Sequence, residues 1–70
     1  MTDNDFLLKV LRGGDWISQD EILRRSQSER GYGMTVHSRA ADLRKKGHMI
    51  VNVVRRGPSG RAQSFYRLVA

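Results

Sequence analysis

The sequence predicts a single α+β domain over residues 1–70, mostly helical, with three helices, a short strand after the first helix and a C-terminal two-stranded β-hairpin. Three observations predict this class. Apolar residues recur at helical spacing in the first two thirds of the chain, and glycines separate the helical segments. The last third changes to runs rich in β-branched residues around a proline–glycine turn. A chain of 70 residues has room for one small hydrophobic core.

The first helix is expected from Asp3 to Arg12. Apolar residues in this segment are spaced four apart, which places them on one face of a helix. Gly13 and Gly14 end the helix, and Trp16–Ile17 follows as a short extended segment. The residues on the apolar face are Phe6, Leu7, Val10 and Leu11.

A capping pattern marks the start of the second helix. Ser18 can accept a hydrogen bond from the backbone amide of Glu21, and the Glu21 side chain can reach back to the Ser18 amide. This helix is therefore expected from about Gln19 to Ser26. A polar connector that contains glycines follows from Ser26 to Gly33.

The third helix is expected from Met34 to Lys46, with Thr35 as its N-cap and Gly47 as its C-terminal stop. On a helical wheel, one side of this segment is apolar and is expected to face the core. The residues on that side are Val36, Ala40 and Leu43.

The C-terminal segment is expected to form the β-hairpin. Its first strand falls between His48 and Arg56, its turn between Gly57 and Gly60, and its second strand between Gln63 and Val69. At least one of Phe65 and Tyr66 is expected to close the hairpin onto the first helix. Four aromatic residues are scattered between elements, so core roles are expected for them in place of stacking on bases; they are Phe6, Trp16, Phe65 and Tyr66.

Basic charge is polarised along the chain, whose formal net charge is +6. Residues 1–22 hold five acidic residues against two basic ones, a net of −3, and residues 23–70 hold eleven basic residues against two acidic ones, a net of +9. A solvated basic face is the simplest interpretation of such an excess. An excess this lopsided in so small a chain nevertheless favours a polyanionic partner, above all nucleic acid.

The composition argues against an enzyme, a metal site and a cofactor. His37 and His48 are the only histidines, and the chain has no cysteine to complete a zinc site. No glycine-rich phosphate loop follows a predicted strand, and so small a core could hardly enclose a small-molecule ligand. The chain has neither an apolar run of membrane-spanning length nor a basic signal peptide, so we expect a cytoplasmic protein without a membrane partner.

The segment Val36–Gly47, followed by His48–Val51 and by Phe65–Leu68, resembles the small winged helix-turn-helix proteins of phages and prophages. In that family the third helix ends in a stretch like Leu-Arg-Lys-Lys-Gly before the hairpin, which is called the wing. The resemblance covers about residues 6–69, with a longer connector before the third helix. It implies a winged helix-turn-helix fold, in which the third helix binds DNA and the wing touches the DNA backbone.

The wheel and the resemblance together nominate the residues that would touch DNA. A recognition helix reads bases chiefly from its N-terminal part, and wing arginines contact phosphates or enter the minor groove. No acidic residue lies near the three wing arginines in the sequence. The DNA-binding set is Thr35, His37, Ser38, Arg39, Lys45, Lys46, Arg55, Arg56 and Arg61.

Structural alternatives stand beside these roles. Thr35 is equally well explained as a helix cap, and the basic residues of the helix end and the wing as solvated side chains. Arg39 could contact guanine or pair with Asp20 or Glu21. Asp42 could accept a hydrogen bond from cytosine, but pairing with one of the two lysines that end the helix is expected.

The sequence thus predicts a double-stranded DNA-binding regulator of phage or prophage type, acting on transcription or recombination in a bacterial or phage-infected cell. Its control is expected to come from abundance, from self-association on DNA or from a protein partner. Two alternatives remain open: a winged-helix module that binds another protein, and a double-stranded RNA binder that uses the same basic face.

Overall fold

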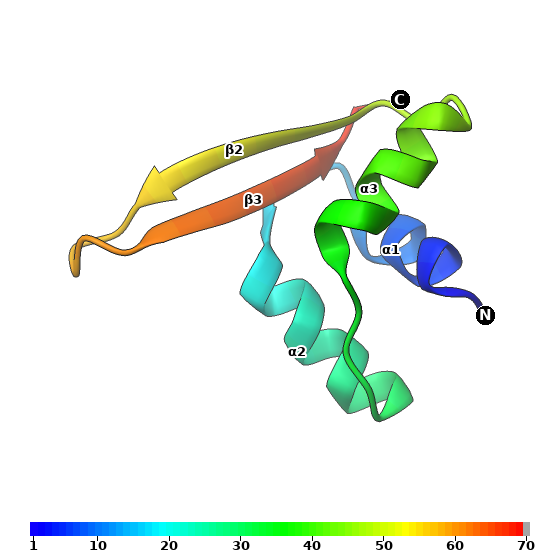
Figure 1. Ribbon diagram of the computed structural model, residues 1–70, viewed down its shortest axis with the longest axis horizontal. Helices are drawn as coiled ribbons and strands as arrows, with labels where there is room; N and C mark the ends of the chain where they lie inside the picture. The colour runs from blue at the N-terminus through cyan, green and yellow to red at the C-terminus, as the bar shows by residue number, and fades with distance from the viewer. Residues whose placement is uncertain (70) are drawn as a thin grey trace.

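The computed structural model describes residues 1–69, and Ala70, the last residue of the predicted domain, lies outside this range. Three helices pack on one face of a three-stranded antiparallel sheet, so the α+β, mostly helical class is confirmed (Figure 1). The elements are α1 (Asp3–Leu11), β1 (Ile17–Ser18), α2 (Gln19–Arg30), α3 (Val36–Lys45), β2 (Ile50–Arg56) and β3 (Ala62–Leu68).

The sheet has the strand order β1-β3-β2. Strands β2 and β3 form one long hairpin, whose register runs from the pair Ile50–Leu68 to the pair Arg56–Ala62. The short strand β1 adds to the other edge of β3 near the base of the hairpin. Figure 1 shows the far half of the hairpin extending beyond the helices, where its own strand pairing and turn hold it. A hydrogen bond from the Gln63 amide to Asp20 Oδ2, at 3.5 Å, joins this half to α2.

The core lies between the helices and the inner face of the sheet. The predicted core side of the third helix is confirmed, and Tyr66 on β3 closes the hairpin onto α1 as expected. The core roles predicted for Trp16 and Phe65 are wrong, because both lie on the sheet face that the helices leave uncovered, where Trp16 is 43% exposed. The buried cluster consists of Leu7, Leu11, Ile22, Val36, Ala40, Leu43, Ile50 and Tyr66.

The caps differ from the expected pattern in three places. Ser18 does accept the Glu21 amide at 3.1 Å, but the Glu21 carboxylate turns away from Ser18 to bond two arginines of α2. The reciprocal capping box is found at α1, where the Thr2 hydroxyl accepts from the Asp5 amide and Asp5 accepts from the Thr2 amide, each at 3.2 Å. Thr35 is the N-cap residue of α3 as expected, but its side chain makes no capping hydrogen bond in the described residues.

The second helix extends to Arg30, beyond the predicted end at Ser26, and the connector shortens to Gly31–Thr35. Gly31 ends the helix with a φ of 80°, a left-handed conformation that glycine adopts without a steric penalty. The expectation failed because the sequence around Ser26 is polar and lacks an apolar stripe, whereas this last turn is stabilised by contacts with α1 and the connector.

Those contacts centre on the guanidinium of Arg30, which lies between the rings of Phe6 and Tyr32, 4.5 and 4.4 Å from their centroids. Arg30 Nη1 donates to Asp3 Oδ1 at 2.9 Å, and Nη2 donates to Ser26 Oγ at 2.7 Å. The Ser26 hydroxyl in turn donates to the Tyr32 carbonyl at 2.7 Å. This Arg30 cluster therefore joins the start of α1, the end of α2 and the connector that leads into α3.

We predict that Arg30→Ala lowers the free energy of unfolding by about 2–4 kcal/mol, because it removes both ring contacts and leaves Asp3 and Ser26 without their partner. The measurement is urea denaturation followed by circular dichroism. Arg24→Ala is the matched control, since Arg24 is 74% exposed and its pair with Glu21 is worth about 1 kcal/mol or less. Equal losses in the two variants would contradict a central role for Arg30.

We predict that the stability of the fold depends on pH through Glu21. The hydrogen bond from Arg25, together with the charge of Arg24, lowers the pKa of Glu21 in the folded chain. The unfolded chain therefore takes up this proton first as the pH falls, and the stabilisation from Glu21 is lost as the pH falls through its folded-state pKa. The stability advantage of the parent over Glu21→Gln should shrink between about pH 6 and pH 3, measured by denaturation at each pH. A difference that stays constant with pH would refute this linkage.

Candidate nucleic-acid interface

Basic side chains that form ion pairs and those that form none lie in different regions of the chain. In the described chain, five basic side chains form ion pairs with acids on the helices: Lys9, Arg24, Arg25, Arg30 and Arg39. Eight others form none within residues 1–69: Arg12, Arg44, Lys45, Lys46, Arg55, Arg56, Arg61 and Arg67. The reason is in the sequence, which has no aspartate or glutamate after Asp42. The end of α3 and the hairpin therefore form a basic segment that contains no acidic residue of its own.

The first turn of α3 presents three of the nominated residues to solvent. Thr35, His37 and Ser38 are exposed, and the intervening Val36 is buried in the core. Because Val36 fixes the rotation of the helix, the exposed side chains keep a set direction relative to the core. The hydroxyl of Thr35, which makes no capping bond within the described range, remains available to another partner.

Arg39 is occupied by an acid on its own helix. Its Nη2 atom lies 3.2 Å from Asp42 Oδ2, and both side chains are partly exposed. The expected pairing of Asp42 with a lysine at the helix end is wrong, and so is the alternative that joined Arg39 to Asp20 or Glu21. The spacing of three residues places Arg39 and Asp42 side by side. Any contact of Arg39 with a base must compete with this pair.

The end of α3 carries three basic residues, of which one is hydrogen-bonded to the backbone of β2 and two are exposed without an ion pair in residues 1–69. Arg44 Nε donates to the Ile50 carbonyl at 2.7 Å, which holds the start of β2 against the helix end. Lys45 and Lys46 are exposed and form no ion pair in residues 1–69. The two lysines therefore remain available to an external anion, and Arg44 acts on the geometry of the turn.

The hairpin tip carries the three remaining nominated residues, Arg55, Arg56 and Arg61, which are all exposed. The turn is closed by two backbone hydrogen bonds, from the Gly57 amide to the Arg61 carbonyl at 3.1 Å and from the Gly60 amide to the Gly57 carbonyl at 2.9 Å. Arg55 and Arg56 are neighbours on a strand and point to opposite faces of the hairpin. Both faces of the tip are therefore positively charged.

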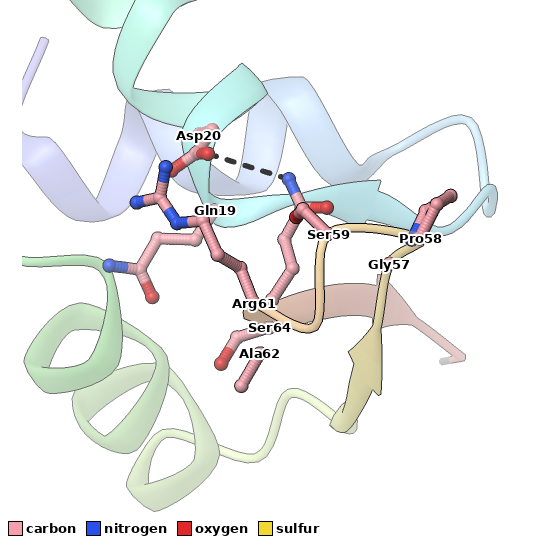
Figure 2. Close-up of a pocket in the computed structure, with 9 residues that line it drawn as sticks. Gln19, Asp20, Gly57, Pro58, Ser59, Arg61, Ala62 and Ser64 are labelled. Carbon is pink, nitrogen blue, oxygen red and sulfur yellow. Dashed lines mark hydrogen bonds between the residues drawn. The ribbon is translucent and has the colours of Figure 1, made fainter.

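A polar hollow of about 380 Å³ lies between the hairpin and the first turn of α2. Figure 2 shows the Arg61 side chain reaching from the hairpin toward Asp20, and the Gln63 amide donates to Asp20 Oδ2 at 3.5 Å. Asp20 is thus an acidic neighbour of Arg61 that the sequence did not reveal, since 41 positions separate them. Its carboxylate reduces the positive potential on this side of the tip. The hollow could not be foreseen, because only the fold brings these segments together.

Residues 1–69 contain no cluster of three or more histidine, aspartate or glutamate side chains that could hold a metal ion. The helices in this range include none long and apolar enough to cross a membrane. Comparison of the chain with protein-family models, curated proteins and solved structures found no match.

Proposed function

We propose that this chain is a winged helix-turn-helix protein that binds double-stranded DNA, with α3 in the major groove and the hairpin as a wing on the backbone or in the minor groove. The order helix, strand, helix, helix, hairpin and the sheet order β1-β3-β2 support this assignment, as does the extension of the hairpin beyond the helices (Figure 1). The proposed role is binding without catalysis or a cofactor.

The observation that carries the proposal is the distribution of unpaired cations. Within residues 1–69, six cations without an ion pair lie between Arg44 and Arg61, on the end of α3 and on the hairpin, whereas α1 and α2 pair most of their cations. Exposed arginines and lysines without acidic partners repel each other, so contact with a polyanion is favourable for them. The polyanion also releases condensed counterions on binding, which contributes to the affinity. The tip arginines and Lys45 and Lys46 are accordingly assigned to phosphates.

The first turn of α3 is assigned to base readout. Thr35, His37 and Ser38 combine exposure with side chains that donate and accept hydrogen bonds, as base edges in the major groove require. Arg39 would join them by exchanging the Asp42 carboxylate for a guanine edge. The contacts to phosphate then position the protein, and the contacts of this turn specify the sequence.

The biological role that we propose is regulation of transcription or recombination, of phage or prophage type, in the cytoplasm of a bacterial or phage-infected cell. This part of the proposal rests on the sequence resemblance described above. Binding to double-stranded RNA through the same basic segment is the competing outcome, because an A-form helix presents a similar density of phosphates.

We predict that the chain binds duplex DNA with an affinity that falls steeply as salt rises, and that duplex RNA competes poorly. Replacing Arg55, Arg56 and Arg61 together by alanine should weaken binding to good and poor DNA sites by similar factors. It should also flatten the slope of log affinity against log salt by about one unit per lost phosphate contact. The measurement is a fluorescence-anisotropy titration of two duplexes at three salt concentrations, with a thermal melt as the folding control.

The matched control replaces Arg24, Arg25 and Lys9, three cations that are already paired on α1 and α2, by alanine. It removes the same formal charge from the opposite part of the chain and should change affinity and salt slope less. Equal effects of the two triple variants would show non-specific attraction by net charge. Salt-independent binding, or preference for RNA, would exclude the proposed function.

A separate prediction tests the first half of α3. Asp42→Asn removes a carboxylate and frees Arg39, so it should strengthen DNA binding several-fold, and Arg39→Ala should weaken binding to a preferred site by about 1–3 kcal/mol. Glu29→Gln is the charge-matched control, because Glu29 pairs with Lys9 on α1. If Asp42→Asn and Glu29→Gln strengthen binding equally, the effect is one of net charge and Arg39 does not read a base.

A further inference from the structure

The sheet has a second face, which points away from the three helices. Side chains alternate across a strand, so the burial of Ile50 and Tyr66 in the core places their strand neighbours on the opposite side. Val53 and Phe65 are directly paired in the register and therefore share that side. We call this surface the outer face; its residues are Trp16, Ser18, Met49, Val51, Val53, Arg55, Gln63, Phe65, Arg67 and Val69.

The outer face is largely apolar and accessible. Trp16, Met49 and Val69 are 43%, 55% and 51% exposed, and the helices of the described chain all pack on the other face (Figure 1). A notch of about 130 Å³ opens at its centre, lined by Trp16, Val53, Arg55 and Phe65. This volume suits one aliphatic side chain. A contiguous apolar surface with a central notch is typical of a site that binds another molecule.

The charge of the outer face has one sign. Arg55 borders the notch on the hairpin side, and Arg67 lies with its guanidinium carbon 5.9 Å from the centre of the Trp16 ring. The strands that bear both arginines contain no acidic residue, and neither arginine forms an ion pair in the described chain. The surface thus offers an apolar centre between two unpaired cations.

We propose that the outer face binds an acidic, apolar segment of a partner protein, with one aliphatic side chain in the notch and carboxylates on Arg55 and Arg67. Carboxylates complement the two guanidinium groups geometrically as well as in charge. A second copy of this chain fits less well, because two outer faces would bring four arginines together. Most acids of the chain are also already bound in ion pairs, those of Asp3, Glu21, Glu29 and Asp42.

This site is distinct from the proposed DNA surface. Arg55 belongs to both, but the notch and Arg67 play no part in the assigned DNA contacts, and an apolar notch gives a phosphate nothing to bind. A protein that binds DNA through α3 and the other tip arginines could therefore hold a partner on the outer face at the same time, with Arg55 bound by only one of the two. Failure of DNA binding would leave the partner site intact, and the reverse also holds.

The test uses three fluorescein-labelled peptides of about eight residues, the length of the strands they would meet. In the first, glutamate alternates with leucine; in the second, serine replaces leucine; in the third, lysine replaces glutamate. Only the first should bind in anisotropy titrations. Trp16 is the single tryptophan of the chain, so an unlabelled copy of the first peptide should also shift its emission.

Variants locate the site. Val53→Glu should weaken binding of the first peptide about tenfold or more, because it places a carboxylate in the notch. Val54→Glu is the matched control: it is the next residue on β2, is 58% exposed and points to the other face, so it should leave peptide binding nearly unchanged. Arg67→Glu should weaken binding about fivefold or more without touching the assigned DNA contacts. Circular dichroism and thermal melts report the fold of each variant.

Five results would overturn the proposal. Four of them are absence of binding by the first peptide, equal binding of the leucine-free peptide, equal effects of Val53→Glu and Val54→Glu in folded proteins, and self-association that Val53→Glu abolishes. Such self-association, measured by sedimentation, would assign the outer face to a second copy of the chain. An unchanged Trp16 emission with the first peptide bound would place that peptide elsewhere and equally exclude the outer face.

Discussion

The position of α3 depends on the Arg30 cluster more than on any other polar contact. The core of this chain is small, and the connector between α2 and α3 consists of five residues, two of them glycine. A connector of this composition has little conformational preference of its own. The guanidinium group of Arg30 restricts the conformation of the connector, because it stacks on the Tyr32 ring and donates a hydrogen bond to Asp3 at the start of α1. The entry of the chain into α3 is therefore fixed by Arg30 together with Ser26, whose hydroxyl donates to the Tyr32 carbonyl.

The same cluster helps to explain how charge is divided between the two halves of the molecule. Asp3, Glu21 and Glu29 form ion pairs with cations on α1 and α2, so those helices are close to neutral. The hairpin and the end of α3 lack acids and keep their charge. Repulsion among these cations is tolerated because they are exposed, where solvent and salt screen it. The fold thus separates a paired scaffold from an unpaired basic segment.

The long hairpin adds two surfaces to the molecule, its tip and its outer side, without requiring a larger core. Its inner side at the base buries Tyr66 and Ile50, and its tip projects past the helices with arginines on both sides. Its outer side exposes Trp16 and the paired Val53 and Phe65. Because strand pairing uses the backbone hydrogen-bonding groups and alternate side chains point in opposite directions, the two faces of the hairpin can differ in polarity and charge. The proposed DNA and partner sites both follow from this geometry.

The sequence by itself determined the element types, the core side of α3, the burial of one of the two adjacent hairpin aromatics and the concentration of basic charge, because periodicity and composition are local properties. Only the tertiary structure decided which cations are free. The Arg39–Asp42 pair, the approach of Asp20 to Arg61 and the exposure of Trp16 depend on side-chain rotamers, on contacts between distant segments and on which sheet face the helices cover. The end of α2 is the clearest case, because its last turn is stabilised by partners outside its own sequence.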